Sequence, residues 1–417
     1  MARVIVVGGG FGGCAAALTA AKAGVEVTLI EKMNRLSGLA PWTGHLSGWI
    51  ARQEALLMDG GAGEIIQMLE SLALHRWPEL GVPSGSVCFD VTKVPEGCRK
   101  LLTESGVQIL LQKRVVSVTV KERKVVSVVL QDGSQVYGDA FVDATGQMSG
   151  VEECERLGQG CVLCMLMCPL FGDRVSITEA AEAPDEKKER PSYMSCVLIA
   201  TESLSPELRE RIETSPSGYT YIDVPDHLQQ YDFTEEWRYP SRPVTRKLGA
   251  KPIQIIHMPF AKTWLNVPTK FIRQIQGFEN AWIVNPLVGG GGQPLRMGAV
   301  APRDNTLRVS GLENLFAAGL KTGDIQGFVE VLFTGDLAGY NATRQALKMS
   351  PMELPSSTLT GFFINEAKNG MTPSDWPSDR KIDQRYYEKG LVTTDMWKIK
   401  ARLGDGGMIG LYSKPLS

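Results

Sequence analysis

The sequence predicts an α/β fold of the Rossmann-like kind. Residues 4–7, 11–23 and 25–30 read as an apolar strand, an alanine-rich helix and a second apolar strand, with a glycine-rich turn between the first two. Further strand patterns occur within residues 107–143, and residues 327–347 have the periodicity of a helix. Strands that alternate with helices in this way favour a parallel sheet covered by helices.

The first 31 residues contain a complete dinucleotide-binding unit. Gly8 permits the tight turn after the first strand, Gly10 lets the backbone approach a pyrophosphate, and Gly13 lets the helix pack close to the strand. The N-terminus of the helix offers N–H groups and partial positive charge to the phosphates. Glu31, at the end of the second strand, is placed to accept hydrogen bonds from a ribose diol.

The composition is that of an ordinary globular protein, with 43% hydrophobic and 22% charged residues among 417. The uncharged stretch at residues 4–21 resembles a membrane span only superficially, because glycines crowd its first turn and a second strand follows. The formal net charge of −2 gives no basic footprint for nucleic acid. We therefore expect a cytoplasmic protein with no membrane partner, whose eight cysteines are thiols.

Three later segments resemble the FAD-binding motifs of the glutathione-reductase-type flavoproteins. Residues 106–115 and 142–146 are similar to the second motif, which implies that the backbone at Val115 meets the adenine. Residues 311–319 resemble the third motif, and residues 327–344 resemble the final helix, whose N-terminus points at the flavin. The resemblance implies a noncovalent FAD in a domain of three layers (ββα). The further cofactor contacts that it implies are Gly12, Lys32, Gly38, Thr43, Gly44, Ala144, Thr145, Gly146, Gly319, Gln326, Gly327 and Phe328.

A more specific resemblance is to the GidA-like group, which contains FAD-dependent tRNA uridine-modifying proteins and folate/FAD-dependent tRNA uracil methyltransferases. Its pattern is similar to residues 314–344 of this chain, and residues 295–298 resemble its Arg-x-Gly segment near the flavin. The resemblance covers approximately residues 1–35, 105–146 and 281–345.

We predict that the chain has four parts. Residues 1–150 form the first part of the FAD-binding domain, and residues 151–280 form an inserted mixed α+β substrate domain with a cysteine-rich segment. Residues 281–347 complete the FAD-binding domain, and residues 348–417 are a C-terminal extension. The charged segment at residues 180–191 reads as a solvated loop.

Cys161, Cys164 and Cys168 would share one face of a helix, because their spacing is i, i+3 and i+7. Three interpretations stay open at this point. The thiols could form a buried packing stripe, act as redox-active or catalytic groups beside the flavin, or bind an iron–sulfur cluster or zinc. If a thiol is catalytic, Cys164 and Cys168 are the first candidates and Cys161 is the next. We predict no metal site.

The sequence predicts an FAD-dependent oxidoreductase that moves a hydride between a small organic substrate and flavin N5, with possible help from a thiol. One alternative is a folate/FAD-dependent transferase that modifies RNA uridine, and another is a non-catalytic electron-transfer subunit. The chain has no second Gly-x-Gly-x-x-Gly unit for a nicotinamide, so the electron donor or acceptor stays open. A homo-oligomer is an open prediction, and nucleic acid is not an expected partner.

Overall fold

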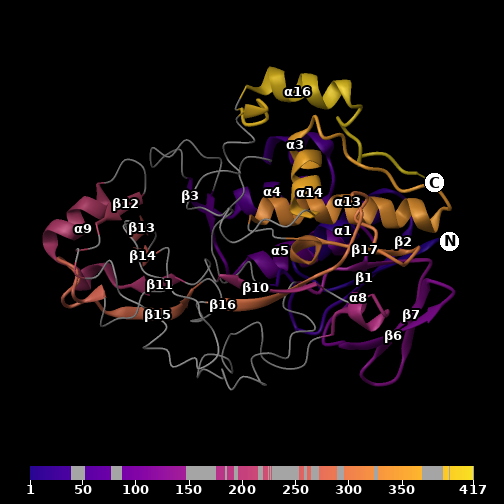
Figure 1. Ribbon diagram of the computed structural model, residues 1–417, viewed down its shortest axis with the longest axis horizontal. Coiled ribbons are helices and arrows are strands. Elements are labelled where there is room, and N and C mark those ends of the chain that lie inside the picture. The colour runs from indigo at the N-terminus through magenta and orange to yellow at the C-terminus, as the bar shows by residue number, and fades with distance from the viewer. Residues whose placement is uncertain are drawn as a thin grey trace.

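The computed structural model describes most of the chain, and every structural statement below concerns the part that it describes (Figure 1). The described residues are 1–38, 52–76, 87–146, 175–183, 186–191, 196–214, 219–223, 225, 227, 253–257, 261–263, 272–288, 295–323, 327–368, 388–393 and 395–416.

The central sheet is parallel and five-stranded, in the order β17-β9-β1-β2-β5, and it combines four strands from residues 3–143 with β17 from residues 315–317. β1 pairs with β2 on one side and with β9 on the other, and Val7 is in register with both Ile30 and Asp143. The carboxyl ends of these three strands therefore meet at one edge. The strands are β1 (Arg3–Val7), β2 (Glu26–Ile30), β5 (Gln108–Leu110), β9 (Ala140–Asp143) and β17 (Leu315–Ala317).

Alternate side chains of the sheet enter two different cores. Val4 and Val6 pack with the helices, whereas Ile5 and Val7 pack with a three-stranded antiparallel meander on the opposite face. The predicted three-layer ββα fold is thereby confirmed. The helical layer holds α1 (Phe11–Lys22), α4 (Gly61–Ser71), α5 (Val94–Glu104) and α13 (Phe328–Ala346), and the meander holds β6 (Val115–Lys121), β7 (Lys124–Leu130) and β8 (Gln135–Tyr137).

A second, antiparallel sheet lies at the opposite end of the molecule (Figure 1), in the order β12-β13-β14-β11-β15. Together with α9 (Pro206–Glu213) it forms a mixed α+β unit, to which β15 contributes residues beyond the predicted boundary at residue 280. The exact domain boundaries stay a prediction. Its strands are β11 (Cys196–Ile199), β12 (Tyr219–Ile222), β13 (Ile253–His257), β14 (Ala261–Thr263) and β15 (Ile283–Val288).

The expectation of a solvated loop at residues 180–191 is wrong for most of the segment. β10 (Glu186–Pro191) pairs along its whole length with β16 (Leu295–Val300), and α8 (Ile177–Ala180) precedes it. The partner strand lies about a hundred residues further along the chain, so local charge gives no signal of the pairing. The remaining described elements are α3 (Arg52–Met58), β3 (Ala73–Arg76), β4 (Val87–Phe89), η3 (Thr201–Ser203), η4 (Gly319–Thr322), α14 (Leu359–Lys368) and α16 (Met396–Asp405).

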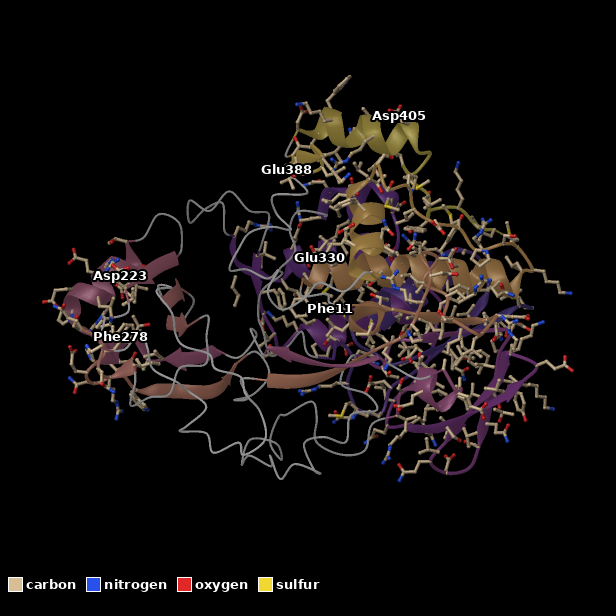
Figure 2. All side chains as sticks on the ribbon, in the orientation of Figure 1. Phe11, Asp223, Phe278, Glu330, Glu388 and Asp405 are labelled. Carbon is tan, nitrogen blue, oxygen red and sulfur yellow. The ribbon has the colours of Figure 1, made fainter. Side chains whose placement is uncertain are left out.

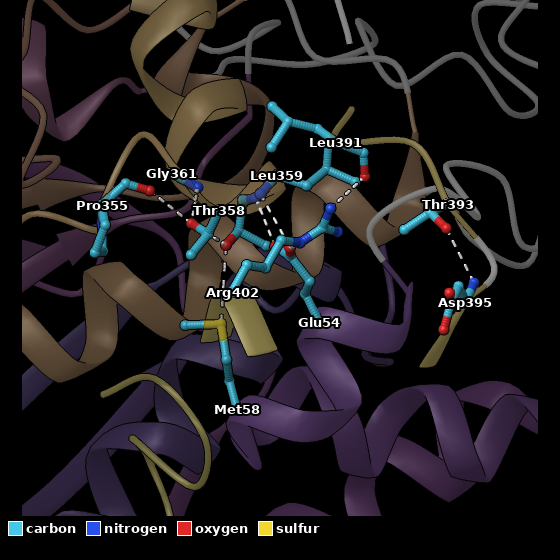
Figure 3. Close-up of polar contacts among 11 residues, drawn as sticks. Glu54, Met58, Pro355, Thr358, Leu359, Gly361, Leu391, Thr393, Asp395 and Arg402 are labelled. Atoms are coloured by element: carbon cyan, nitrogen blue, oxygen red, sulfur yellow. Dashed lines mark hydrogen bonds and ion pairs between the residues drawn. The ribbon is translucent and has the colours of Figure 1, made fainter. Parts of the chain in front are cut away.

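Glu54 of α3 connects this helix to two helices of the C-terminal region, α14 and α16 (Figure 3). Its carboxylate is 1% exposed and accepts hydrogen bonds from the backbone N–H groups of Leu359 (3.0 Å) and Thr360 (2.8 Å), at the start of α14. The same carboxylate accepts from Arg402 Nε of α16 at 2.7 Å. Arg402 also donates to the carbonyl of Leu391 at 2.6 Å. Residues 388–403 are therefore fixed to α3 through one buried carboxylate.

The Glu54→Ala variant should lose on the order of 3–5 kcal/mol of unfolding free energy, because Arg402 would keep a buried charge without its partner. Chemical denaturation measures the loss, and limited proteolysis should cleave residues 388–403 first. Arg3→Ala is the matched control: the ion pair between Arg3 and Glu26 is about half exposed, so its removal should cost no more than about 1 kcal/mol. Equal losses in the two variants would contradict this account.

Asp336 joins α13 to α1 and α4. Its Oδ1 accepts from the Thr19 hydroxyl at 2.7 Å and from the Ala62 N–H at 2.9 Å, while its Oδ2 has no partner. Burial raises the pKa of Asp336 to about 7, and the hydrogen bonds from Thr19 and Ala62 oppose this rise only in part. The side chain therefore binds a proton in the folded state at a pH at which the unfolded chain has lost it.

Because the pKa of Asp336 is higher in the folded protein than in the unfolded chain, wild-type stability should fall as the pH rises from about 4 to about 7 and then level off. Asp336→Asn keeps the shape of the protonated carboxyl without its titration. Thermal melting at pH 5 and pH 8 should show a gain for the variant that is larger at pH 8, on the order of 4 kcal/mol at most. The exposed Asp223 provides the control variant Asp223→Asn. A gain that does not depend on pH would refute the assignment.

Candidate cofactor site

The glycine-rich turn after β1 has no room for side chains at two positions. Gly8 has φ +106°, and a Cβ there would overlap the carbonyl oxygen of Ala144. A Cβ at Gly13 would overlap the carbonyl oxygen of Gly8. Both glycines are therefore required by the protein's own packing, which agrees with the roles that the spacing predicts.

Gly10 is different, because nothing in the described part of the chain requires a glycine there. It has an extended conformation (φ −69°, ψ 178°) at the N-cap of α1, and a Cβ would meet no heavy atom within 4 Å. Open space therefore lies in front of the helix N-terminus, and a glycine N-cap has no side-chain oxygen for the first-turn N–H groups. This arrangement fits a phosphate group of a dinucleotide.

The N-terminus of α13 lies beside that of α1. The rings of Phe11 and Phe328, at the first positions of the two helices, make an edge-to-face contact with centroids 5.4 Å apart. Figure 2 shows Phe11 and Glu330 close together at the middle of the molecule. The N-cap of α13 is Gly327, so this helix also has no side-chain cap. Two partial positive charges thus lie at one edge of the sheet.

Glu330, in the first turn of α13, adds no negative charge to this edge. It is 7% exposed, its Oε2 has no hydrogen-bond partner, and burial raises the pKa of Glu330 to about 8. The carboxyl is therefore largely protonated at neutral pH, and the positive end of the helix is not neutralised.

Asp143 organises the end of β9, and the sequence analysis did not identify it as a site residue. Its buried carboxylate accepts from the hydroxyls of Thr145 and Thr178, both at 2.6 Å, and from the backbone N–H of each at 3.0 Å. Its carbonyl accepts from the N–H of Ala318 at 2.9 Å. The sequence contains one sign of this role, because Asp143 stands directly before Ala144-Thr145-Gly146. Its other partner, Thr178, is 35 residues away and gives no local sign.

Glu31 has a structural task besides the predicted ribose contact. It is 8% exposed, and it accepts from the N–H of Gly9 at 2.6 Å and from that of Met33 at 2.7 Å. An ionised carboxylate has about four acceptor positions, so capacity remains for a ribose diol. Replacing Glu31 would therefore disturb the glycine turn as well as a bound nucleotide.

The structure brings most predicted cofactor residues to the carboxyl edge of the central sheet. Gly12 lies against Gly319, whose Cα would be 2.9 Å from a Cβ on Gly12, and Gly38 lies against Gly10. Val115 begins β6 two residues after Lys113, whose N–H donates to Glu31 O at 3.1 Å. Lys32 follows Glu31 and is exposed. The predicted residues outside the described part of the chain are Thr43, Gly44, Gln326, Cys161, Cys164 and Cys168, and all site assignments stay predictions.

Two described cysteines are buried thiols, Cys14 of α1 and Cys98 of α5. Their mutual hydrogen bond and burial raise the pKa of Cys98 well above its usual value, so it is a packing group without thiolate character. In the described ranges, no three His, Cys, Asp or Glu side chains are grouped to hold a metal ion. No described helix is long and apolar enough to span a bilayer.

Two family models match the chain in separate regions. The family described as FAD dependent oxidoreductase matches residues 3–149, which contain β1, β2 and the meander. The family described as Glucose inhibited division protein A matches residues 255–350, which contain β17 and α13. Together they cover both segments that meet at the carboxyl edge.

Five curated relatives share one name, methylenetetrahydrofolate–tRNA-(uracil-5-)-methyltransferase TrmFO. The protein of Prochlorococcus marinus is 24% identical over 411 residues, covering 88% of this chain and 85% of the relative. The protein of Koribacter versatilis is 20% identical, covering 87% and 86%. The protein of Thermus thermophilus is 31% identical over 145 residues, covering 31% of this chain and 32% of its own length.

Solved structures show the same fold at low identity. Aquifex aeolicus GidA in its form II crystal superposes with a TM-score of 0.61 at 17% identity, covering 97% of this chain and 76% of that protein. The form I crystal gives a TM-score of 0.57, also at 17% identity, over 97% and 78%. At this identity the likeness establishes the fold alone.

The Gly10→Leu variant should lose FAD affinity by about a hundredfold or more, because the side chain would fill the open space in front of α1. The apoprotein should melt at the wild-type temperature, since no atom of the described residues lies within 4 Å of a Cβ at this position. Flavin fluorescence titration and thermal melting measure the two effects separately. The matched variant Gly13→Ala should instead destabilise the apoprotein. Wild-type FAD affinity in Gly10→Leu would show that the cofactor lies elsewhere.

The two family models, the curated relatives and the solved structures agree with the resemblance seen in the sequence and with the glycine turn, paired helix N-termini and three-layer fold. FAD is accordingly the cofactor of this chain. The chain is an FAD-dependent flavoprotein similar to the GidA and TrmFO proteins.

Proposed function

We propose that this chain is a flavoenzyme that transfers a one-carbon unit from a folate to the uracil ring of an RNA. The observation that carries the proposal is the match along 88% of this chain to a relative named for that reaction. FAD-binding motifs alone are shared by flavoproteins with many substrates. A match that continues through the region between these motifs supports a common substrate class as well.

The chemistry explains why such a transferase would need a flavin. The one-carbon unit of methylenetetrahydrofolate has the oxidation level of formaldehyde, so converting it to a methyl group requires two further electrons and a proton. A bound FAD, once reduced by an electron donor such as a reduced nicotinamide, would supply these electrons as a hydride. The chain's own contribution is the carboxyl edge of the sheet, where two uncapped helix N-termini and a protonated Glu330 favour negative charge.

A second candidate is an oxidoreductase that transfers a hydride to or from a small organic substrate. The net charge of −2 favours it, because a nucleic-acid enzyme usually presents a basic surface. The family model over residues 3–149, described as FAD dependent oxidoreductase, is equally compatible with this reaction. A catalytic role for Cys161, Cys164 or Cys168 is compatible with both reactions and stays a proposal.

The two candidates separate in one assay. The full chain, loaded with FAD, is incubated with methylenetetrahydrofolate, reduced nicotinamide and an unmodified tRNA transcript. We expect uridine methylated at C5, detected by mass spectrometry of the digested RNA, and its loss when folate is omitted. Gly10→Leu is the cofactor-deficient control. Flavin that is reduced and reoxidised by a small substrate, with no methylated uridine in any reaction, would favour the oxidoreductase instead.

A further inference from the structure

We propose that the outward face of α16 is an RNA contact surface, with Trp397 stacking on an unpaired base and Lys400 contacting the adjacent phosphate. The inference rests on the proposed function, since it assigns a binding surface to the RNA substrate. Four observations support it: the exposure of Trp397, the unpaired lysines, the positions of the nearby acids, and the firm anchoring of the helix.

α16 is anchored through one face and exposed on the other. Ile399 is 2% exposed and Leu403 is fully buried, and both belong to the main core. The helix lies at the outer edge of the molecule, over α3 (Figure 1). Trp397 is 77% exposed, although an indole ring normally finds cover in a monomeric protein. Because Glu54 and Arg402 fix the helix, the ring is presented on a rigid support.

Two exposed lysines, Lys398 and Lys400, lie close to Trp397 in the helix. Neither ammonium group has a partner among the described residues. Trp397 and Lys400 are three residues apart, so their side chains lie on the same side of the helix. The nearest acid in the sequence, Asp395, is occupied as the N-cap, where it accepts from the N–H groups of Trp397 and Lys398.

An aromatic ring beside unpaired cations is the combination that binds single-stranded nucleic acid, because bases stack on the ring and phosphates attract the ammonium groups. A second copy of the chain fits this face less well. In a symmetric dimer the same patch meets itself, so Lys398 and Lys400 of both copies would be brought together. Charge complementarity therefore favours RNA as the occupant.

Fluorescence polarisation with a labelled tRNA transcript tests the surface on the full FAD-loaded chain. Trp397→Ala should weaken binding about tenfold or more, and Trp397→Phe should restore most of it, since phenylalanine still stacks. Lys400→Ala should reduce the slope of log affinity against log salt by about 0.7–0.9. Trp282→Ala is the matched control, because Trp282 is 60% exposed in the second sheet unit and should leave RNA affinity unchanged.

The outcomes separate this inference from the proposed function. Wild-type RNA affinity in Trp397→Ala, together with normal formation of methylated uridine, would overturn the surface and leave the function standing. If Trp397→Ala changes the molar mass measured by light scattering and leaves RNA affinity intact, the face binds a second copy of the chain. This result would also overturn the inference. If the wild type neither binds RNA nor forms methylated uridine, the proposed function itself is overturned.

Discussion

The contact between α1 and α13 is the constraint on which the rest of the structure depends. A Cβ at Gly335 would overlap the carbonyl of Gly12, and one at Gly339 would overlap the carbonyl of Ala16, so the two helices touch backbone to backbone. A helix from the first residues of the chain is thereby locked against one that begins at Phe328. This contact places two helix N-termini at the same edge of the sheet, where a dinucleotide with two phosphates and a redox ring can use both.

The C-terminal region completes the same helical layer. Leu359, Phe363 and Tyr412 belong to the core that contains α1 and α13, and the N–H of Tyr412 donates to Met58 O at 3.0 Å. The ring of Tyr412 also contacts Tyr340 edge to face, at 5.1 Å between centroids. Residues that follow α13 in the sequence therefore support this helix. Two buried carboxyl groups, those of Glu54 and Asp336, join these distant segments.

The sequence alone predicts the elements whose stabilising contacts are local. The turn from Gly8 to Gly13, the two helices that pack against each other and the alternating strands before Asp143 follow from spacing and periodicity. The helix at residues 328–346 differs from its predicted bounds by one residue at each end, whereas the strand that ends at Asp143 begins three residues later than predicted. The sequence was insufficient where the partner is distant. β10 is held by a strand more than a hundred residues away, and the Thr19 hydroxyl reaches Asp336 across 317 residues. No local pattern encodes either contact, and the cysteine segment lies outside the described residues.

The most direct test of the account is the flavin content of the purified full chain. The structure and its relatives predict one FAD per chain, released intact by denaturation, with the absorbance bands of a protein-bound flavin. Absorbance spectroscopy and chromatography of the released cofactor, before and after reconstitution with FAD, measure this directly. A chain that is folded by circular dichroism yet shows no flavin bands after reconstitution would contradict the central claim that the paired helix N-termini form an FAD site.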